Sequence, residues 1–587
     1  MNAAARVRRW VVPSLLVIAG LVALLQSLYY FTRTVDDLFI SLRYAAHLAD
    51  GTGLVYNPGE YVEGFSSPLW VVLQAIGHLA GIDGVTATKV ISLASLGLLA
   101  VMTFTYSRSV LQTPPTLAAM GCVALAANSY VMAWAWLGLE TPLYLALLVA
   151  WPLTLHHLVA RPSVARGALA TATGCALGTV RPEAPLFVGL LLCSSAAAPS
   201  ASLFGQRARH LAGVAVVVGL VLSLLLLARH SYFDGWLPHT YYAKRGAGFA
   251  IAKLRPLWSM GAHPVEVLLL LVSLVGACWL AVRRRLDALV VLVANGLFVG
   301  AVGEDWMPNQ RHLLPTWVFS TMASTALVAR LWSVGEDEDA WGSSSHRAVR
   351  HIATIGSACV LLLLGAAGVH QIGIDSRFSA KEFLTHGRGR NWVRFKTLGA
   401  WRDAWLALRR IPTPDIAARS VHRLGMIGQL FRVLENAPDA EDEEWYVGRD
   451  IGRLGYLSPV RVFDTDGLFT PAVVAYGFRP GTERVPPSLA RQVFALHPLA
   501  GEVYEAWPPA LAPYLQRDHY EIVVGSPRYP VAFVRRGPKP PAEVVLDRYD
   551  RVDAMLPHGY YVSTLYGECV GAAFDKRHAY VRDRFVP

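Results

Sequence analysis

Long apolar runs recur through the first 371 residues of this 587-residue sequence, and most of the loops between them contain arginine. A run of roughly 20 residues crosses the hydrocarbon core of a bilayer as a helix. The mean hydropathy is +0.37 and charged residues make up 16% of the chain, whereas soluble proteins carry roughly a quarter. The sequence therefore predicts a polytopic α-helical membrane protein.

We expect about eleven transmembrane helices in residues 1–371. The first covers Trp10–Phe31 and is expected to remain as an uncleaved signal anchor. The second covers Val85–Tyr106, and the others are expected at 115–133, 139–159, 166–181, 184–199, 210–228, 263–282, 286–302, 313–331 and 350–371. Residues 68–81 are apolar but too short to cross, so they are expected to lie at the interface or to re-enter the same side.

Basic residues indicate the orientation of these helices. Arg6, Arg8 and Arg9 precede the first run, so the positive-inside rule places the N-terminus in the cytoplasm. With alternating orientation, the other loops predicted to be cytoplasmic also carry arginine: Arg161, Arg166, Arg207, Arg209, Arg283, Arg284, Arg285 and Arg330. Residues 32–84 are then predicted to form a loop on the outer face.

Residues 372–587 are predicted to form a separate soluble domain on the outer side. No apolar run of membrane-spanning length remains there, and charged residues and prolines become frequent. VRVFDTDGLF and YEIVVGSPRYPVAFVRR alternate as strands do, whereas DAWLALRRI and SLARQVFALH have helical spacing. The domain is therefore expected to be mixed α/β.

The charge distribution argues against nucleic-acid binding, and the cysteine positions argue against disulfides and thiolate metal sites. The net charge is +11, but the basic residues fall largely in loops between apolar runs and in the C-terminal region, with no basic stripe interleaved with aromatics. This distribution does not indicate nucleic-acid binding. Of the six cysteines, all but Cys569 lie in apolar segments, so neither a disulfide framework nor a thiolate metal site is expected.

Two adjacent carboxylates, Asp36 and Asp37, follow the first apolar run directly. Acidic residues at a membrane face cost free energy unless they are hydrated, paired or used, so the pair is a candidate functional site. One alternative is that both aspartates cap the following helix. Another is that they bind a divalent cation through oxygen ligands.

The acidic pair begins a block that resembles a known family. Residues 36–70, DDLFISLRYAAHLADGTGLVYNPGEYVEGFSSPLW, are similar to the actinobacterial terminal arabinofuranosyltransferases (the AftB type) of the GT-C superfamily. Shorter motifs follow in the expected order: LGLETPLY at 137–144, RPE at 181–183, GEDWMPNQRHLLP at 303–315 and FDTDGL at 463–468. The resemblance thus extends over most of the chain.

The resemblance implies a fold, a reaction and a location. It implies a GT-C transmembrane domain that transfers D-arabinofuranose from decaprenyl-phosphoryl-arabinose to the ends of arabinan. The products would be terminal β-(1→2) linkages in arabinogalactan and lipoarabinomannan, made on the outer face of the plasma membrane for cell wall biogenesis. Other GT-C families share an outer acidic pair, so the identity of the donor sugar depends on the resemblance alone.

Transfer from such a carrier needs a carboxylate at the reacting centre and cations at the departing phosphate. Asp36 and Asp37 are the candidates for the first role, and which of the two acts is left open. For the donor phosphate we nominate residues on the predicted outer face: Arg181, His239, Lys244 and Arg311. An ion pair between Arg181 and Glu183 is the structural alternative for that arginine.

Further polar and aromatic residues on the same face are candidates for binding substrate: Glu63, Glu140, Tyr241, Tyr242, Asp305 and His312. The tyrosines have the alternative role of an interfacial aromatic belt, and the two glutamates could cap loops. Asp464 and Asp466 are expected to stabilise a turn. No cofactor is expected, apart from a divalent cation if the acidic pair binds one.

The stereochemistry and the class of function retain alternatives. A β-linked donor and a β-linked product require retention of the anomeric configuration, through a nucleophilic aspartate or a front-face attack, whereas a single displacement would invert it.

The nearest alternative enzyme is a polyprenyl-phosphate-dependent mannosyltransferase. A lipid-linked-sugar flippase or transporter and a catalytically silent binding subunit are the alternatives outside enzymology, and polar residues gathered at one membrane face favour chemistry over transport.

Overall fold

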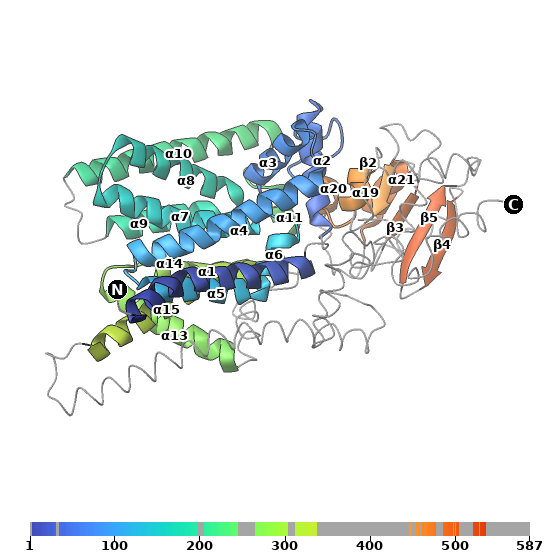
Figure 1. Ribbon diagram of the computed structural model, residues 1–587. Helices are drawn as coiled ribbons and strands as arrows, with labels where there is room; N and C mark the ends of the chain where they lie inside the picture. Colours follow the sequence, from blue (N-terminus) through green and yellow to red (C-terminus); the bar gives the residue numbers. More distant parts are fainter. Residues whose placement is uncertain are drawn as a thin grey trace, which may run out of the picture.

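The computed structural model describes two parts of the chain. The first comprises residues 3–30, 35–197, 205–244, 264–302 and 311–336, and it is helical. The second comprises 445–448, 452–457, 461–476, 485–496, 498, 500–503, 520–526 and 529–535. The helices of the first part form a bundle, and the second part lies at one end of that bundle, away from the N-terminus (Figure 1).

The helices of the bundle coincide with the predicted apolar runs. They are α1 (Ala3–Tyr30), α4 (Gly84–Ser109), α5 (Pro115–Ala127), α6 (Ser129–Trp136), α7 (Thr141–Ala160), α8 (Val164–Val180), α9 (Ala184–Ala196), α10 (Gln206–Phe233), α13 (Pro264–Val282), α14 (Asp287–Val302) and α15 (Leu314–Glu336). The pair α5–α6 is bent by 64°. Every crossing expected between residues 10 and 331 therefore falls on a described helix or on this bent pair, and the one expected at 350–371 lies outside the described residues.

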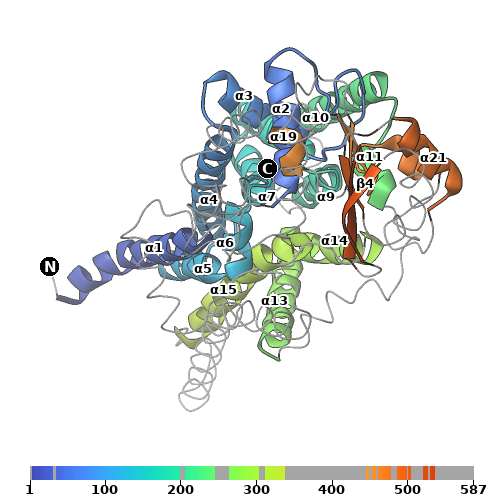
Figure 2. The same ribbon diagram turned by 90° about the vertical axis from the view of Figure 1, so that its right-hand side faces the viewer.

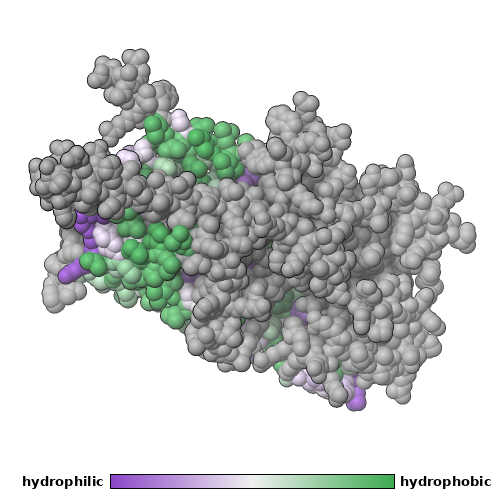
Figure 3. All heavy atoms as spheres, turned by 90° about the horizontal axis from the view of Figure 1, so that it is seen from below, coloured by the Kyte–Doolittle hydropathy of each residue, from purple (hydrophilic) through white to green (hydrophobic). Residues whose placement is uncertain are grey.

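Length and composition support a membrane location for this bundle. Among the described residues, Gly84–Ser109, Thr141–Ala160 and Ala208–Phe233 are long and apolar enough to cross a membrane, and the α5–α6 pair would add a fourth span. Hydrophobic residues also gather on the face of the bundle seen in Figure 3. The total of about eleven crossings stays a prediction.

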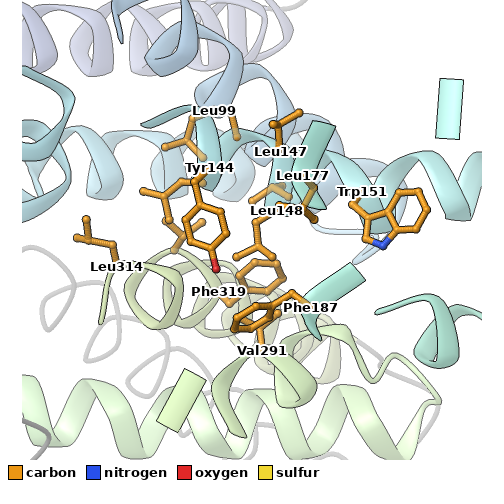
Figure 4. Packing of buried hydrophobic residues seen from close by; sticks show 14 of the residues in the cluster. Leu99, Tyr144, Leu147, Leu148, Trp151, Leu177, Phe187, Val291, Leu314 and Phe319 are labelled. Atoms are coloured by element: carbon orange, nitrogen blue, oxygen red, sulfur yellow. The ribbon is translucent and has the colours of Figure 1, made fainter. Parts of the chain in front are cut away.

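Small residues let the helices of the bundle approach closely. A Cβ added to Gly174 in α8 would lie 2.8 Å from the Trp151 ring of α7, and one on Gly276 in α13 would lie 2.7 Å from the Ala323 carbonyl oxygen of α15. Such contacts are how helices associate in lipid, where apolar burial gives little driving force. Figure 4 shows Trp151, Phe187 and Phe319 among the buried residues of this core.

Two short helices precede α4 at the end of the bundle nearest the C-terminal part (Figure 1). They are α2 (Asp37–Ala49) and α3 (Pro68–Leu79). The 12 residues of α3 extend about 18 Å at 1.5 Å per residue, well short of a hydrocarbon core about 30 Å thick. The expectation that residues 68–81 do not cross is consistent with this length, and it stays a prediction.

The described C-terminal part contains a five-stranded mixed sheet in the order β2-β1-β3-β5-β4. Its strands are β1 (Trp445–Gly448), β2 (Arg461–Asp464), β3 (Ala500–Val503), β4 (Tyr520–Ser526) and β5 (Tyr529–Arg535). β1 pairs in parallel with β2 and β3, and β5 pairs antiparallel with β3 and β4. Helices α19 (Gly452–Leu457), α20 (Pro471–Ala475) and α21 (Pro487–Ala495) complete it.

These elements are mixed α/β, and three of the four segments assigned from their spacing have the expected structure. VRVFDTDGLF contains β2, YEIVVGSPRYPVAFVRR forms β4 and β5, and SLARQVFALH contains most of α21. DAWLALRRI lies outside the described residues. The domain boundary at residues 371–372 also lies outside them and stays a prediction.

Candidate active site

The acidic pair lies at the start of α2, where the bundle meets the C-terminal part. Asp37 is the first residue of α2, and Asp36 occupies the N-cap position without a side-chain hydrogen bond to that helix. Instead, Oδ2 of Asp36 accepts a hydrogen bond of 2.6 Å from the Gly452 amide of α19. The capping alternative therefore does not describe the Asp36 side chain, whose orientation is set by a distant segment.

A loop between α6 and α7, residues 137–140, lies directly against the acidic pair. The Val35 amide donates to the Leu137 carbonyl at 3.1 Å. Gly138 has φ +97°, and a Cβ there would also lie 2.7 Å from Leu38, so this position requires glycine. The Trp70 indole N–H donates to the Gly138 carbonyl at 3.3 Å. Segments from α2 and α3 thus fix the loop that carries Glu140.

Lys89 of α4 contacts the end of α6, directly before this loop. Its ammonium group donates a hydrogen bond to the Trp136 carbonyl, and the side chain is buried. The sequence reasoning did not select Lys89, because a single lysine near the start of an apolar run has no distinguishing pattern.

Glu140, Arg181 and Glu183 form a buried ionic cluster beside this loop. Arg181 Nη1 lies 2.7 Å from Glu140 Oε1, and Arg181 Nε lies 2.5 Å from Glu183 Oε1. All three side chains are at most 8% exposed. The ion pair of Arg181 with Glu183 is therefore present, and Glu140 makes no capping hydrogen bond to α7. Because two carboxylates share one guanidinium, the cluster carries one more negative than positive group.

Glu63 occupies a second buried position, in the loop between α2 and α3. Its Oε2 lies 2.7 Å from Nε of Arg229, near the end of α10. Burial raises the pKa of Glu63 to about 7, against the opposing effect of Arg229. Arg229 is a site residue that the sequence reasoning missed. Its signal was an arginine at the end of an apolar run on the predicted outer face, where the positive-inside rule disfavours one.

The nominated residues of α11 (His239–Lys244) follow α10 and reach the same loop. The His239 amide donates to the Glu63 carbonyl at 2.9 Å, and burial lowers the pKa of the His239 imidazole. Its ring lies 6.2 Å from that of Tyr242, whereas Tyr241 is 45% exposed. Lys244 is the last residue of α11.

Arg311 and His312 lie on the 3-10 helix η2 (Arg311–Leu313) at the start of α15. The Arg311 guanidinium lies over the Trp134 ring of α6, 5.3 Å from its centroid. The His312 ring packs edge-on against Phe298 at 5.4 Å. Asp305, the remaining nominated residue of this segment, lies outside the described residues.

The structure therefore gathers the nominated residues into two groups joined through α2. Around the loop 137–140 lie Asp36, Glu140 and Arg181. Arg311 is connected to this group through α6, because its guanidinium lies over the Trp134 ring. Around the loop 50–67 lie Glu63 and the residues of α11. Tyr44 of α2 connects the second group to the acidic pair, since its hydroxyl donates to the Val62 carbonyl and accepts from the Gly64 amide.

The motif FDTDGL forms the turn that was expected. Asp464 is buried, and its two carboxylate oxygens accept hydrogen bonds from the amides of Asp466 at 2.9 Å and Leu468 at 2.6 Å. Burial, followed by the neighbouring Asp466, raises the pKa of Asp464 to about 8. Phe469, just after the turn, stacks on Tyr56 with 3.9 Å between ring centroids, so this motif joins the C-terminal part to the loop 50–67.

Within the described ranges, no group of three or more histidine, cysteine, aspartate or glutamate side chains is arranged to hold a metal ion. Binding of a divalent cation by Asp36 and Asp37 stays a prediction.

No protein-family model matches this sequence. One curated relative is the terminal β-(1→2)-arabinofuranosyltransferase of Mycobacterium tuberculosis, which is 30% identical over 230 residues. That match covers 36% of this chain and 35% of the relative, so it spans about a third of the relative's length.

Solved structures of similar shape cover nearly the whole chain. The apo crystal structure of ArnT from Cupriavidus metallidurans matches with a TM-score of 0.51 and 16% identity, covering 92% of this chain and 100% of ArnT. Archaeal oligosaccharyltransferase AglB from Archaeoglobus fulgidus has a TM-score of 0.49 and 13% identity, covering 96% and 78%. The ArnT match confirms the predicted GT-C fold, and about a third of the chain is similar in sequence to a terminal arabinofuranosyltransferase.

Proposed function

We propose that this protein is a polyprenyl-phosphate-dependent glycosyltransferase that transfers D-arabinofuranose from decaprenyl-phosphoryl-arabinose to the ends of cell-wall arabinan. The observation that carries the proposal is the placement of Asp36 and Asp37. The pair lies at one end of a GT-C bundle, with Asp36 held by Gly452 and the pair flanked by the loop that carries Glu140. The similarity to an arabinofuranosyltransferase supports the choice of sugar.

In the proposed reaction, the bond between the anomeric carbon and the donor phosphate breaks, and its electron pair leaves with decaprenyl phosphate. The 2-hydroxyl of the terminal arabinose forms the new bond, and its proton passes to a carboxylate of the acidic pair. Retention follows if an aspartate first forms a covalent arabinosyl intermediate, or if the hydroxyl attacks on the face that the phosphate leaves.

The charges of the site suggest how the departing phosphate is held. Arg181 already faces Glu140 and Glu183 at ion-pair distance, so its attraction for a further anion is reduced. We therefore assign the phosphate to cations outside this cluster: Arg311, which lies over the Trp134 ring of α6, and His239 and Lys244 of α11. Arg181 then orients Glu140. Glu140 and Glu63 accept hydrogen bonds from sugar hydroxyls. The other residues proposed to contact substrate are Tyr241, Tyr242, Asp305 and His312.

The sidedness of the enzyme is part of the proposal. Helix α2, which begins at the acidic pair, and the C-terminal sheet lie at the same end of the bundle (Figures 1 and 2). The arginine-rich loops predict that the opposite end is cytoplasmic, so the reaction would occur on the periplasmic side of the plasma membrane, where arabinogalactan and lipoarabinomannan would be the acceptors.

The test uses purified wild type, Asp36→Asn and Asp37→Asn, incubated with decaprenyl-phosphoryl-arabinose and a short arabinan acceptor. The product linkage is read by NMR. We expect a β-(1→2)-linked product from wild type and its loss in at least one variant, which then identifies the reacting carboxylate. Product only from a mannosyl donor would replace the donor while retaining the fold, and inactivity with every donor would reject the transferase proposal.

A further inference from the structure

A second polar site lies at the other end of the bundle. A cavity of about 70 Å³ opens where α4, α7 and α9 end and α14 begins, lined by His156, Ser194, Arg284, Arg285 and Asp287 among others. Helix α7 begins beside Glu140 and ends at this cavity, and its 20 residues extend about 30 Å. Because Pro152 and Ala160 of α7 both line it, the cavity lies about 18–30 Å along this helix from Glu140.

The turn that forms one wall of the cavity holds an arginine where the backbone favours glycine. The Arg285 amide donates to the Leu280 carbonyl and the Arg284 amide donates to the Ala281 carbonyl, both at 2.8 Å. These two bonds form a Schellman motif at the end of α13, with Arg284 at the left-handed position and φ +58°. Glycine adopts this conformation without steric cost. The turn would therefore be at least as stable with glycine at position 284, so the backbone conformation does not explain the arginine.

The side chains around the cavity leave a positive excess at its mouth. Arg284 is exposed and Arg285 partly buried, and Arg285 Nη1 lies 3.3 Å from Nδ1 of His156. Asp287 supplies the opposing charge on the wall, but both of its carboxylate oxygens already accept hydrogen bonds, from Tyr106 at 2.8 Å and Ser194 at 2.5 Å. An anion entering the cavity would thus meet two guanidinium groups against one carboxylate.

The surroundings of the cavity indicate that it lies at the depth of lipid headgroups. Arg283 lies over the Trp279 ring, 5.4 Å from its centroid, and tryptophan is enriched at membrane interfaces. Val282 is 84% exposed, and Leu274 and Val275 of α13 are also exposed, as is typical of a surface that faces acyl chains. An apolar surface therefore leads along α13 to the cationic mouth.

We propose that this cavity binds the phosphate group of an anionic phospholipid from the leaflet opposite the proposed active site. Arg284 and Arg285 would bind the phosphate oxygens through charge-assisted hydrogen bonds, and the acyl chains would lie along α13. The cavity volume of about 70 Å³ is roughly five times the 10–15 Å³ that a single water needs, which is comparable with the five heavy atoms of a phosphate group. By the positive-inside rule, this leaflet is the cytoplasmic one.

The experiment measures lipid retention by the purified full-length protein and needs no transferase activity. Four delipidated proteins are compared: wild type, Arg284→Gly, Arg284→Gln and the control Arg209→Gln. Arg209 is an exposed basic residue at the start of α10. Each protein is incubated with phosphatidylglycerol, phosphatidylcholine or inorganic phosphate. Bound molecules are counted by native mass spectrometry, and the thermal midpoint of each variant is measured in parallel.

We expect wild type and Arg209→Gln to retain phosphatidylglycerol in preference to phosphatidylcholine. Both Arg284 variants should lose about tenfold in affinity, the size of one charge-assisted contact. Arg284→Gly should keep or raise the thermal midpoint, which separates loss of the site from loss of the fold. Equal retention by wild type and Arg284→Gly, an equal loss in Arg209→Gln, or binding of inorganic phosphate without binding of lipid would each overturn the proposal.

Discussion

The backbone amide of Gly452 donates a hydrogen bond of 2.6 Å to the Asp36 carboxylate, although 416 positions separate the two residues. The rest of α19 reinforces this contact. Arg43 of α2 donates to the Gly455 carbonyl, and the Tyr456 ring lies 5.8 Å from that of Phe39. Helices α2 and α19 lie together in both ribbon views (Figures 1 and 2). The C-terminal part thus positions one of the two proposed catalytic carboxylates.

Gly452→Ala should reduce turnover more than it reduces stability. An added Cβ would lie 2.9 Å from Oδ2 of Asp36 and closer still to its carbonyl oxygen, so α19 must move and the hydrogen bond is lost. A hydrogen bond to a charged group contributes about 1.5–3 kcal/mol, which corresponds to a loss of roughly ten- to a hundredfold in rate. Gly97→Ala in α4 has open space around it and is the control. Equal turnover in the two variants would contradict a positioning role for Gly452.

Stability should fall as the pH rises through the titration of Glu63. Its pKa is raised from 4.5 to about 7, so between these values the folded protein holds a proton that the unfolded chain has released. The stabilisation is fully present below about 4.5 and is lost as the pH rises to about 7, by at most about 3 kcal/mol. Glu63→Gln should remove this dependence. Thermal midpoints of both proteins across this window test it, and parallel pH profiles would contradict it.

Arg181→Met should destabilise the bundle strongly. The substitution leaves Glu140 and Glu183 buried without their shared counter-ion, and breaking such a pair costs about 3–5 kcal/mol. Glu183→Gln, which keeps the pair with Glu140, should cost less. The measurement is the midpoint of thermal unfolding in detergent. A normal midpoint with weakened donor binding would instead show that Arg181 serves the donor and not the fold.

Lys244→Ala should weaken binding of the donor, because the change removes a cation from α11, whose first residue contacts the Glu63 loop. Loss of one charge-assisted contact corresponds to about tenfold in affinity. The assay is titration with decaprenyl-phosphoryl-arabinose, and Arg209→Ala at the opposite end of the bundle is the control. Unchanged affinity would remove Lys244 from the site.

Helix α3 should begin and end on the same side of the membrane. Cysteines replacing Pro68 and Ile82 would report this, because Ile82 is exposed and its replacement leaves Asp83 free to cap α4 through the Thr86 amide at 2.8 Å. The background must lack the native cysteines, in particular Cys193 and Cys278, which are exposed, and Cys569, which falls in the predicted outer domain. An impermeant thiol reagent added from outside should label both positions. Labelling of one position alone would show that residues 68–81 cross.

The helices could be predicted from the sequence because each depends on local composition. Lipid offers no hydrogen bonds to the backbone, so a long apolar run becomes a helix whatever it packs against. The apolar run expected to be helical at Val85–Tyr106 is accordingly found as the helix Gly84–Ser109. The turn at Asp464 was equally predictable, since its side chain bonds the amides of residues two and four positions ahead.

The environment of the candidate site was decided by the tertiary structure alone. The pair Arg181–Glu140 joins residues 41 positions apart, Glu63 meets Arg229 from another helix, and Asp36 meets Gly452 from the C-terminal part. A carboxylate's charge and orientation depend on which groups surround it in space, and no periodicity in the sequence records those partners. The sequence thus determined the membrane helices and the acidic pair, whereas long-range packing determined which groups hold and balance the charges of these carboxylates.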